Sequence, residues 1–179
     1  MADEKKEPWL NWLALSTVIL AVCATMATFK GGGYSTKSVL SQTQASDQWA
    51  FYQAKSIKGY LYELQRDKLQ LELKAQGASF SPDAVDEYKK SIEAAEGKIR
   101  DYKKERDEIQ KEAKKLEVFR TDCGAHSAAF GFGVIFLQIA ILLSSISALM
   151  KKKPLWIAGM AVGIVGIVHF VNGFFLFLK

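Results

Sequence analysis

Residues 123–150 read CGAHSAAFGFGVIFLQIAILLSSISALM, a run of 28 residues without Asp, Glu, Lys or Arg. A helix needs about 20 mainly apolar residues to cross the hydrocarbon core of a bilayer. Two similar runs lie on either side, 22 residues at Pro8–Phe29 and 25 residues at Pro154–Leu178. Because a charge at the bilayer centre costs about 2.5–3.5 kcal/mol, we interpret the three runs as transmembrane helices over 9–29, 123–150 and 155–178.

The short segments around these helices complete the expected organisation. Residues 1–8 form a polar tail, and its acidic leader Met1–Glu7 argues against a cleaved secretory signal. Three consecutive glycines predict a flexible joint over residues 30–33, since glycine loosens or breaks a helix. A tight loop over residues 151–154, Lys151-Lys152-Lys153-Pro154, joins the last two spans.

The charged residues gather between the first two spans. Residues 30–122 hold 18 basic and 16 acidic side chains, interspersed as on a solvated coiled coil. This near balance argues against a nucleic-acid partner, because no one-sided basic patch appears. Small or apolar residues spaced by three and four predict two helical arms, 34–76 and 82–122, which form a hairpin over 34–122. Ser81 is the expected N-cap of the second arm, and Pro82 suits its first position.

Each arm has its own predicted heptad seam, the stripe of residues that faces a partner helix in a coiled coil. The first seam contains Asp47 and Lys68 as polar exceptions, and the two seams pair when facing residue numbers add to 159 or 160. The first seam is Leu40, Thr43, Asp47, Ala50, Ala54, Ile57, Leu61, Leu64, Lys68, Leu71 and Ala75. The second is Val85, Tyr88, Ile92, Ala95, Ile99, Tyr102, Arg106, Ile109, Ala113, Leu116, Arg120 and Cys123.

The predicted fold class is therefore all-α, with three transmembrane helices and a long antiparallel coiled-coil hairpin inserted between the first and second. The very short lysine loop places its own face and the N-terminus in the cytoplasm by the positive-inside rule. The hairpin is then expected outside, in the periplasm of a Gram-negative cell. Lys30, Lys37 and Arg120 on the hairpin side, with the acidic tail, favour the opposite orientation.

An aromatic cluster in the first arm is the main candidate interface. Trp49, Tyr52 and Tyr60 form a second ridge beside the seam, and Asp47 and Phe51 adjoin it. A two-helix hairpin cannot bury both seam and ridge, so we expect the ridge to contact another copy of the chain or an unknown protein partner. The alternative is that these rings lie over the edges of the hairpin seam.

Within the spans, polar and small residues suggest two further roles. Gln138 and His169 are expected at similar depths, and Asn172 lies on the same face of the third span as His169. These residues either line an ion or proton path or form an interhelical hydrogen bond that fixes packing. The packing interpretation is preferred, because no acidic or basic residue joins them. Glycines permit close helix approach, and three of them recur at helical spacing in the third span: Gly159, Gly163 and Gly166.

Neither a metal site nor a cofactor is predicted. Cys123 and His126 are too few ligands for a closed site in one chain, and no histidine lies in a folded soluble pocket where a catalytic triad could form. We therefore predict no catalytic residues and no enzymatic activity.

The string DQWAFYQAKSIK, residues 47–58, follows the first span and the GGGYS joint. In this order it resembles the bacterial membrane-protein family called domain of unknown function 4337, over nearly the whole chain. Phe51 stands where the family pattern has Tyr. The resemblance implies a multi-pass protein of the bacterial inner membrane and implies no activity. The sequence thus favours a non-enzymatic scaffold or interaction protein in the lipid bilayer that self-associates through hairpin and spans. The alternative is a channel or transporter, or its accessory subunit, with a polar path near Gln138 and His169.

Overall fold

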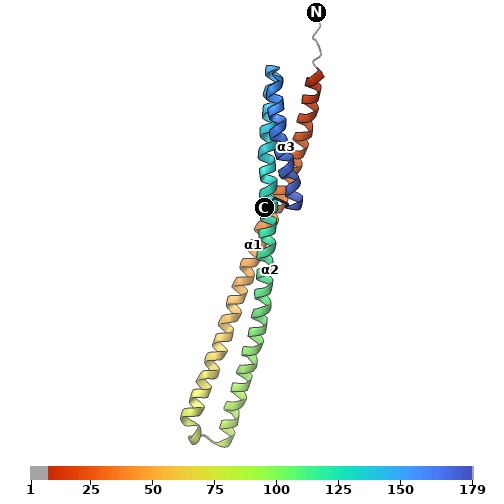
Figure 1. The fold of residues 1–179 in the computed structure, drawn as a ribbon. Coiled ribbons are helices and arrows are strands. Elements are labelled where there is room, and N and C mark those ends of the chain that lie inside the picture. Colours follow the sequence, from red (N-terminus) through yellow and green to blue (C-terminus); the bar gives the residue numbers. More distant parts are fainter. Residues whose placement is uncertain (1–7, 179) are drawn as a thin grey trace, which may run out of the picture. The chain divides into compact units, whose positions relative to one another are not determined.

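The structure is a computed structural model that describes residues 8–178, so residues 1–7 of the tail predicted over 1–8 lie outside the described residues, and Pro8 begins the first helix. It is all-α. Its three long helices are α1 (Pro8–Gln76), α2 (Pro82–Met150) and α3 (Lys153–Phe175), with a short 3₁₀ turn, η1 (Gly77–Ser79), between the first two (Figure 1). Each of the three long helices is long and apolar enough to cross a membrane.

The chain divides into two compact units, and the two long helices contribute to both. We call residues 8–40 with 119–178 the apolar unit and residues 41–118 the charged unit. The apolar unit holds the parts of α1 and α2 that are rich in apolar residues together with all of α3. The charged unit holds the remaining parts of α1 and α2 and the turn that joins them.

In the apolar unit, α2 packs against both other helices. Its buried core includes Leu20 and Ala24 of α1 with Leu137 and Ala140 of α2. Phe130 of α2 is fully buried, and its ring meets that of Phe174 in α3 edge-on, with centroids 4.9 Å apart. Segments far apart in the sequence are thus held side by side by apolar packing.

The backbone at Gly31–Gly33 differs from the expected flexible joint, because α1 remains helical through all three glycines. Close packing explains this for Gly31, which is buried, since a Cβ added there would lie 3.0 Å from Cβ of Phe130. Ser127 Oγ also donates a hydrogen bond to the Gly31 carbonyl oxygen, at 3.1 Å. The helical segments on both sides of the glycines and the contact with α2 stabilise the helical backbone here. They offset the roughly 1 kcal/mol by which each glycine destabilises a helix.

The helix ends follow local chemistry. Ser81 caps α2 as predicted, because its Oγ accepts a hydrogen bond from the backbone N–H of Ala84 at 3.3 Å. The loop between α2 and α3 is even shorter than expected, and Ser147 Oγ donates to the carbonyl oxygen of Lys152 within it. Helix α3 ends at Phe175, three residues before the predicted boundary, where Leu176 turns into the left-handed conformation with φ of 49°.

In the charged unit, α1 and α2 run antiparallel on either side of η1 (Figure 1). Cross-contacts fix how far along each other they lie. Lys55 forms an ion pair with Glu105, and Tyr88 Oη donates a hydrogen bond to Glu72 Oε2 at 3.1 Å. The residue numbers add to 160 in both pairs, which matches the predicted axial register.

The predicted seam of the second arm is the inward face of α2. Ala95 and Ala113 are buried at 3% and 0% exposure, and Ile99, Tyr102 and other seam members are half-buried. The predicted seam of the first arm is wrong, because all eleven of its positions from Leu40 to Ala75 are exposed. Helix α1 is therefore rotated about its own axis relative to the prediction.

A different stripe of α1 faces α2, and it also repeats with heptad spacing. We call it the inner face: Ser41, Ala45, Gln48, Tyr52, Lys55, Gly59, Tyr62, Arg66, Leu69 and Leu73, all buried or half-buried. Contacts with α2 account for the choice. Gly59 lies beside Tyr102, whose Cβ would be in ordinary van der Waals contact, at 3.7 Å, with a Cβ at position 59. Polar residues of α1 that pair with α2 also lie on this side; Lys55, for example, forms an ion pair with Glu105.

Candidate functional site

The aromatic ridge of the first arm is divided between two faces of α1. Trp49 and Tyr52 are half-buried against α2, where Trp49 Nε1 donates a hydrogen bond to Glu117 Oε1 at 2.9 Å. The Arg106 guanidinium lies over the Tyr52 ring, 5.5 Å from its centroid. Both rings therefore contribute to the pairing of α1 with α2.

The other members of the predicted interface are more exposed, although Tyr60 also lines the small cavity between α1 and α2. Phe51 is 50% exposed and Tyr60 is 59% exposed, and Asp47 is exposed as well. They share the side of α1 that carries the exposed leucines. An uncovered apolar surface of this kind in a charged helical unit is typical of a protein interaction site.

The exposed stripe itself is the most distinctive surface of the charged unit. Its large members are Ile57, Leu61, Leu64 and Leu71, which are 60% to 68% exposed. We call the whole stripe the outer seam: Thr43, Asp47, Ala50, Ala54, Ile57, Leu61, Leu64, Lys68, Leu71 and Ala75. Sequence reasoning found these residues through their spacing but assigned them the wrong partner.

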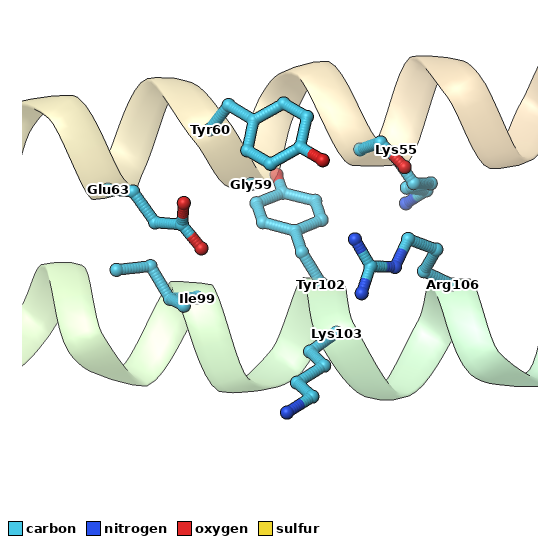
Figure 2. A pocket seen from close by; sticks show the side chains of 9 residues that line it. Lys55, Gly59, Tyr60, Glu63, Ile99, Tyr102, Lys103 and Arg106 are labelled. Atoms are coloured by element: carbon cyan, nitrogen blue, oxygen red, sulfur yellow. The ribbon is translucent and has the colours of Figure 1, made fainter.

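A polar centre lies between the two helices of the charged unit, around a small cavity of about 50 Å³ (Figure 2). Tyr102 points from α2 toward Gly59, and Arg106 lies on the same side as Lys55, whereas Lys103 points away from α1. The Lys55 ammonium lies 5.3 Å from the centroid of the Tyr102 ring. Its positive charge is thus balanced by Glu105 and by an aromatic face.

This centre has the character of a structural element. The cavity holds no more than a few water molecules by volume. Within the described part of the chain, Arg106 Nε is buried and has no hydrogen-bond partner. Nearer the turn, the hydrogen bond donated to Glu72 raises the pKa of Tyr88 above its ordinary value, with burial as a smaller cause. These features fix how α1 and α2 pair.

The polar residues of the spans do not form one group. Gln138 is exposed on α2, whereas His169 is half-buried and stacks on Phe136 with ring centroids 5.7 Å apart. Nδ1 of His169 is buried without a hydrogen-bond partner among the described residues. Asn172 is buried and acts as a helix-end cap, because its Oδ1 accepts a hydrogen bond from the Leu178 N–H at 2.7 Å.

The three glycines of α3 are buried at helix contacts. Gly159 faces Ala140 of α2, and Gly163 faces Leu20 of α1, where an added Cβ would lie 3.1 Å from Leu20 Cδ2. Gly166 is tighter still, because an added Cβ would lie 2.9 Å from the backbone nitrogen of Leu137. Glycine at this position is a condition for the close approach of α2 and α3.

One contact group escaped sequence reasoning. His126 Nδ1 hydrogen-bonds the carbonyl oxygen of Gly173 at 2.8 Å, and its Nε2 lies 3.8 Å from Asp122 Oδ2. Its ring stacks on Tyr34, with centroids 4.5 Å apart. His126 thereby links α1, α2 and α3, and the only sequence signal was its spacing of four residues from Asp122. Among residues 8–178, no group of three His, Cys, Asp or Glu side chains is placed to hold a metal ion.

Taken together, the described residues define a helical protein with three apolar helices long enough to span a bilayer and a charged two-helix unit that exposes an apolar stripe. The comparison with known families agrees with this class. The chain belongs to the family described as Domain of unknown function (DUF4337), which matches residues 9–176. No curated protein and no solved structure matches the chain.

The close contact at Gly166 gives a direct test of packing in the apolar unit. We expect Gly166→Ala to lower the free energy of unfolding by about 1–3 kcal/mol, because the new methyl group meets backbone that cannot move aside. Thermal unfolding of the detergent-solubilised chain, followed by circular dichroism, measures the change. Gly131→Ala is the matched control, since nothing lies within 4 Å of its added Cβ. Equal melting temperatures for the two variants would contradict the assignment.

Proposed function

We propose that this chain is a non-enzymatic scaffold or interaction protein of the bacterial inner membrane, which self-associates through its charged unit and its spans. The observation that carries the proposal is the exposed apolar stripe on α1, whose large members remain at least 60% exposed after α1 has paired with α2. A charged helix in water does not ordinarily leave an apolar surface of this size exposed.

The energetics favour burial of this stripe. Complete burial of a Leu or Ile side chain stabilises by about 1.5–3 kcal/mol. Four such side chains, Ile57, Leu61, Leu64 and Leu71, keep 60% or more of their surface available. Association would gain about 1 kcal/mol or more from each in every copy. Confinement to a membrane reduces the loss of translational freedom that opposes this gain.

The charged unit suits a structural role. We interpret it as an antiparallel coiled-coil hairpin inserted between the first two spans, because the inner face of α1 and the inward face of α2 both repeat at heptad spacing. Its polar centre at Lys55, Glu105 and Arg106 supports a fixed pairing of the arms. The cavity at that centre, about 50 Å³, is too small for an organic substrate or cofactor.

Self-association is the property to measure first. We expect the full chain in mild detergent to have a protein mass at least twice that of one copy, by light scattering with the detergent contribution subtracted. The mass should fall with dilution if exchange is reversible. A mass of one copy at every concentration, together with one copy per unit after crosslinking in native membranes, would contradict the proposal.

The orientation proposed is a cytoplasmic N-terminus and lysine loop, with the charged unit outside. It rests on the three lysines in the short loop between α2 and α3 and on the contact of Trp9 with Trp156, whose ring centroids are 6.2 Å apart. This pair puts the start of α1 and the start of α3 at the same end of the apolar unit. Tryptophan is enriched at membrane interfaces.

Labelling with a membrane-impermeant maleimide tests this orientation. In a chain with Cys23 and Cys123 replaced by alanine, Ser79→Cys in the turn should react in intact spheroplasts. Lys152→Cys is the control and should react only after lysis. The reverse pattern would place the charged unit in the cytoplasm.

The second candidate function is transport, in which an oligomer places a polar path near Gln138 and His169. One observation favours it: Nδ1 of His169 is buried without a partner among the described residues, and Gln138 faces outward where another copy could meet it. If the scaffold proposal is right, liposomes that contain Gln138→Leu or His169→Leu will show the same proton and potassium flux as those with the unsubstituted chain. A flux that either substitution abolishes would favour transport instead.

A further inference from the structure

The occupant of the outer seam can be inferred from the seam's own pattern. Its residues alternate spacings of three and four from Thr43 to Ala75, and every one of them is exposed. This spacing keeps a stripe in contact with another supercoiled α-helix. A membrane surface requires only a broad apolar face with basic residues beside it, whereas this stripe is flanked by acidic Asp67 and Glu72 as well as by basic Lys58 and Lys74.

We propose that the outer seam of one chain pairs with the outer seam of a second copy of the same chain, in a parallel, in-register coiled coil. The inference rests on the proposed function, since it names the interface of the self-association suggested above. Copies inserted in one membrane with the same topology run in the same direction. Identical helices that pair in parallel are in register when each residue meets its own counterpart.

Residue sizes along the seam fit a helix partner. In heptad notation, Ala54 and Leu61 occupy a positions, whereas Ile57 and Leu64 occupy d positions. The small residues Ala50 and Ala54 allow the backbones to approach, and the larger residues from Ile57 to Leu64 fill the layers that follow. Phe51 and Tyr60, which are 50% and 59% exposed, occupy flanking positions and would cover the edges of these layers.

Charges along the seam also fit a second copy. Lys68 is a polar a position, and two copies in register bring two lysines together. Two acidic residues of the same chain lie near this lysine. Glu72 Oε1 lies 3.9 Å from Lys68 Nζ, and Asp67 lies on the opposite flank of the outer seam. Each Lys68 therefore has acidic neighbours from both copies. Polar a positions such as Asp47 and Lys68 lower the stability of a coiled coil but fix its register.

The inner face does not compete for this role, because α2 already covers it. Tyr52 contacts Arg106 there, and Lys55 pairs with Glu105. The two stripes lie on different sides of α1, so one helix can bind α2 and a second copy at the same time.

Disulfide crosslinking at one position tests both the partner and its direction. In a full-length chain whose Cys23 and Cys123 are alanine, Ala54→Cys should form disulfide-linked dimers in native membranes when oxidised with copper–phenanthroline. Ala94→Cys is the matched control, because it is the same substitution at an exposed site on α2. We expect at least tenfold more dimer at position 54. An antiparallel pairing of the same layers would place Ala54 opposite Leu64, about 15 Å from its own counterpart.

The outcomes separate this inference from the proposed function. Dimer at position 54 supports the parallel outer seam. Dimer only in a mixture of Ala54→Cys and Leu64→Cys chains would overturn the parallel direction. Self-association by mass without either disulfide would overturn the outer seam as the interface and leave the scaffold proposal standing. A chain that has the mass of one copy would overturn both.

A double variant distinguishes loss of association from loss of the fold. Leu61→Gln with Leu64→Gln changes two exposed side chains and should raise the dissociation constant for self-association at least tenfold, with the helix content unchanged. Ala94→Gln with Asp101→Gln, at exposed sites on α2, should leave that constant unchanged. Equal association of the two double variants would overturn the inference.

Discussion

Helix α1 in the charged unit carries two heptad-spaced stripes, and α2 covers only one of them. This constraint governs the rest of the unit. The inner face offers small side chains and polar partners, such as Gly59 beneath Tyr102 and Lys55 beside Glu105. The outer seam has larger aliphatic residues and remains exposed. Pairing within one chain thus uses the inner face, and the aliphatic residues of the outer seam stay exposed.

The apolar unit is held together on a different principle. Between helices surrounded by lipid, the hydrophobic effect gives little preference for one contact over another, so close backbone approach and dispersion decide the packing. Gly163 and Gly166 bring α3 against Leu20 and Leu137, and Phe130 fills the space near Gly173. Hydrogen bonds then fix the orientation, as at Trp156 Nε1, which donates to Ser16 Oγ at 3.1 Å. His126 completes this set near the end of α3.

Much of this arrangement could be predicted from the sequence, because it depends on one-dimensional patterns. Runs without charge indicated the apolar helices, Ser81 indicated the start of α2, and matching repeats indicated the axial register of the two arms. The rotation of α1 was not predictable in the same way. The leucines of the outer seam gave the stronger periodic signal, and the inner face, with Gln48, Lys55 and Arg66, looked like a solvated surface. That the inner face fits against α2 is clear only from the structure, where it packs against the bulky side chains of α2. The helical backbone at Gly31 likewise depended on its contact with Phe130.

The error in the rotation of α1 is itself informative about function. The outer seam has the residue spacing of a coiled-coil seam, and for that reason it was predicted to be the hairpin interface. It keeps this spacing although α2 packs against the inner face of α1. Random solvent-facing positions do not place apolar residues at seven of ten successive positions spaced by three and four, as the outer seam does from Thr43 to Ala75. The same residues that were predicted to close the hairpin therefore carry the pattern that the proposed second interface requires. Under that proposal, pairing of the arms and association between copies use different faces of one helix.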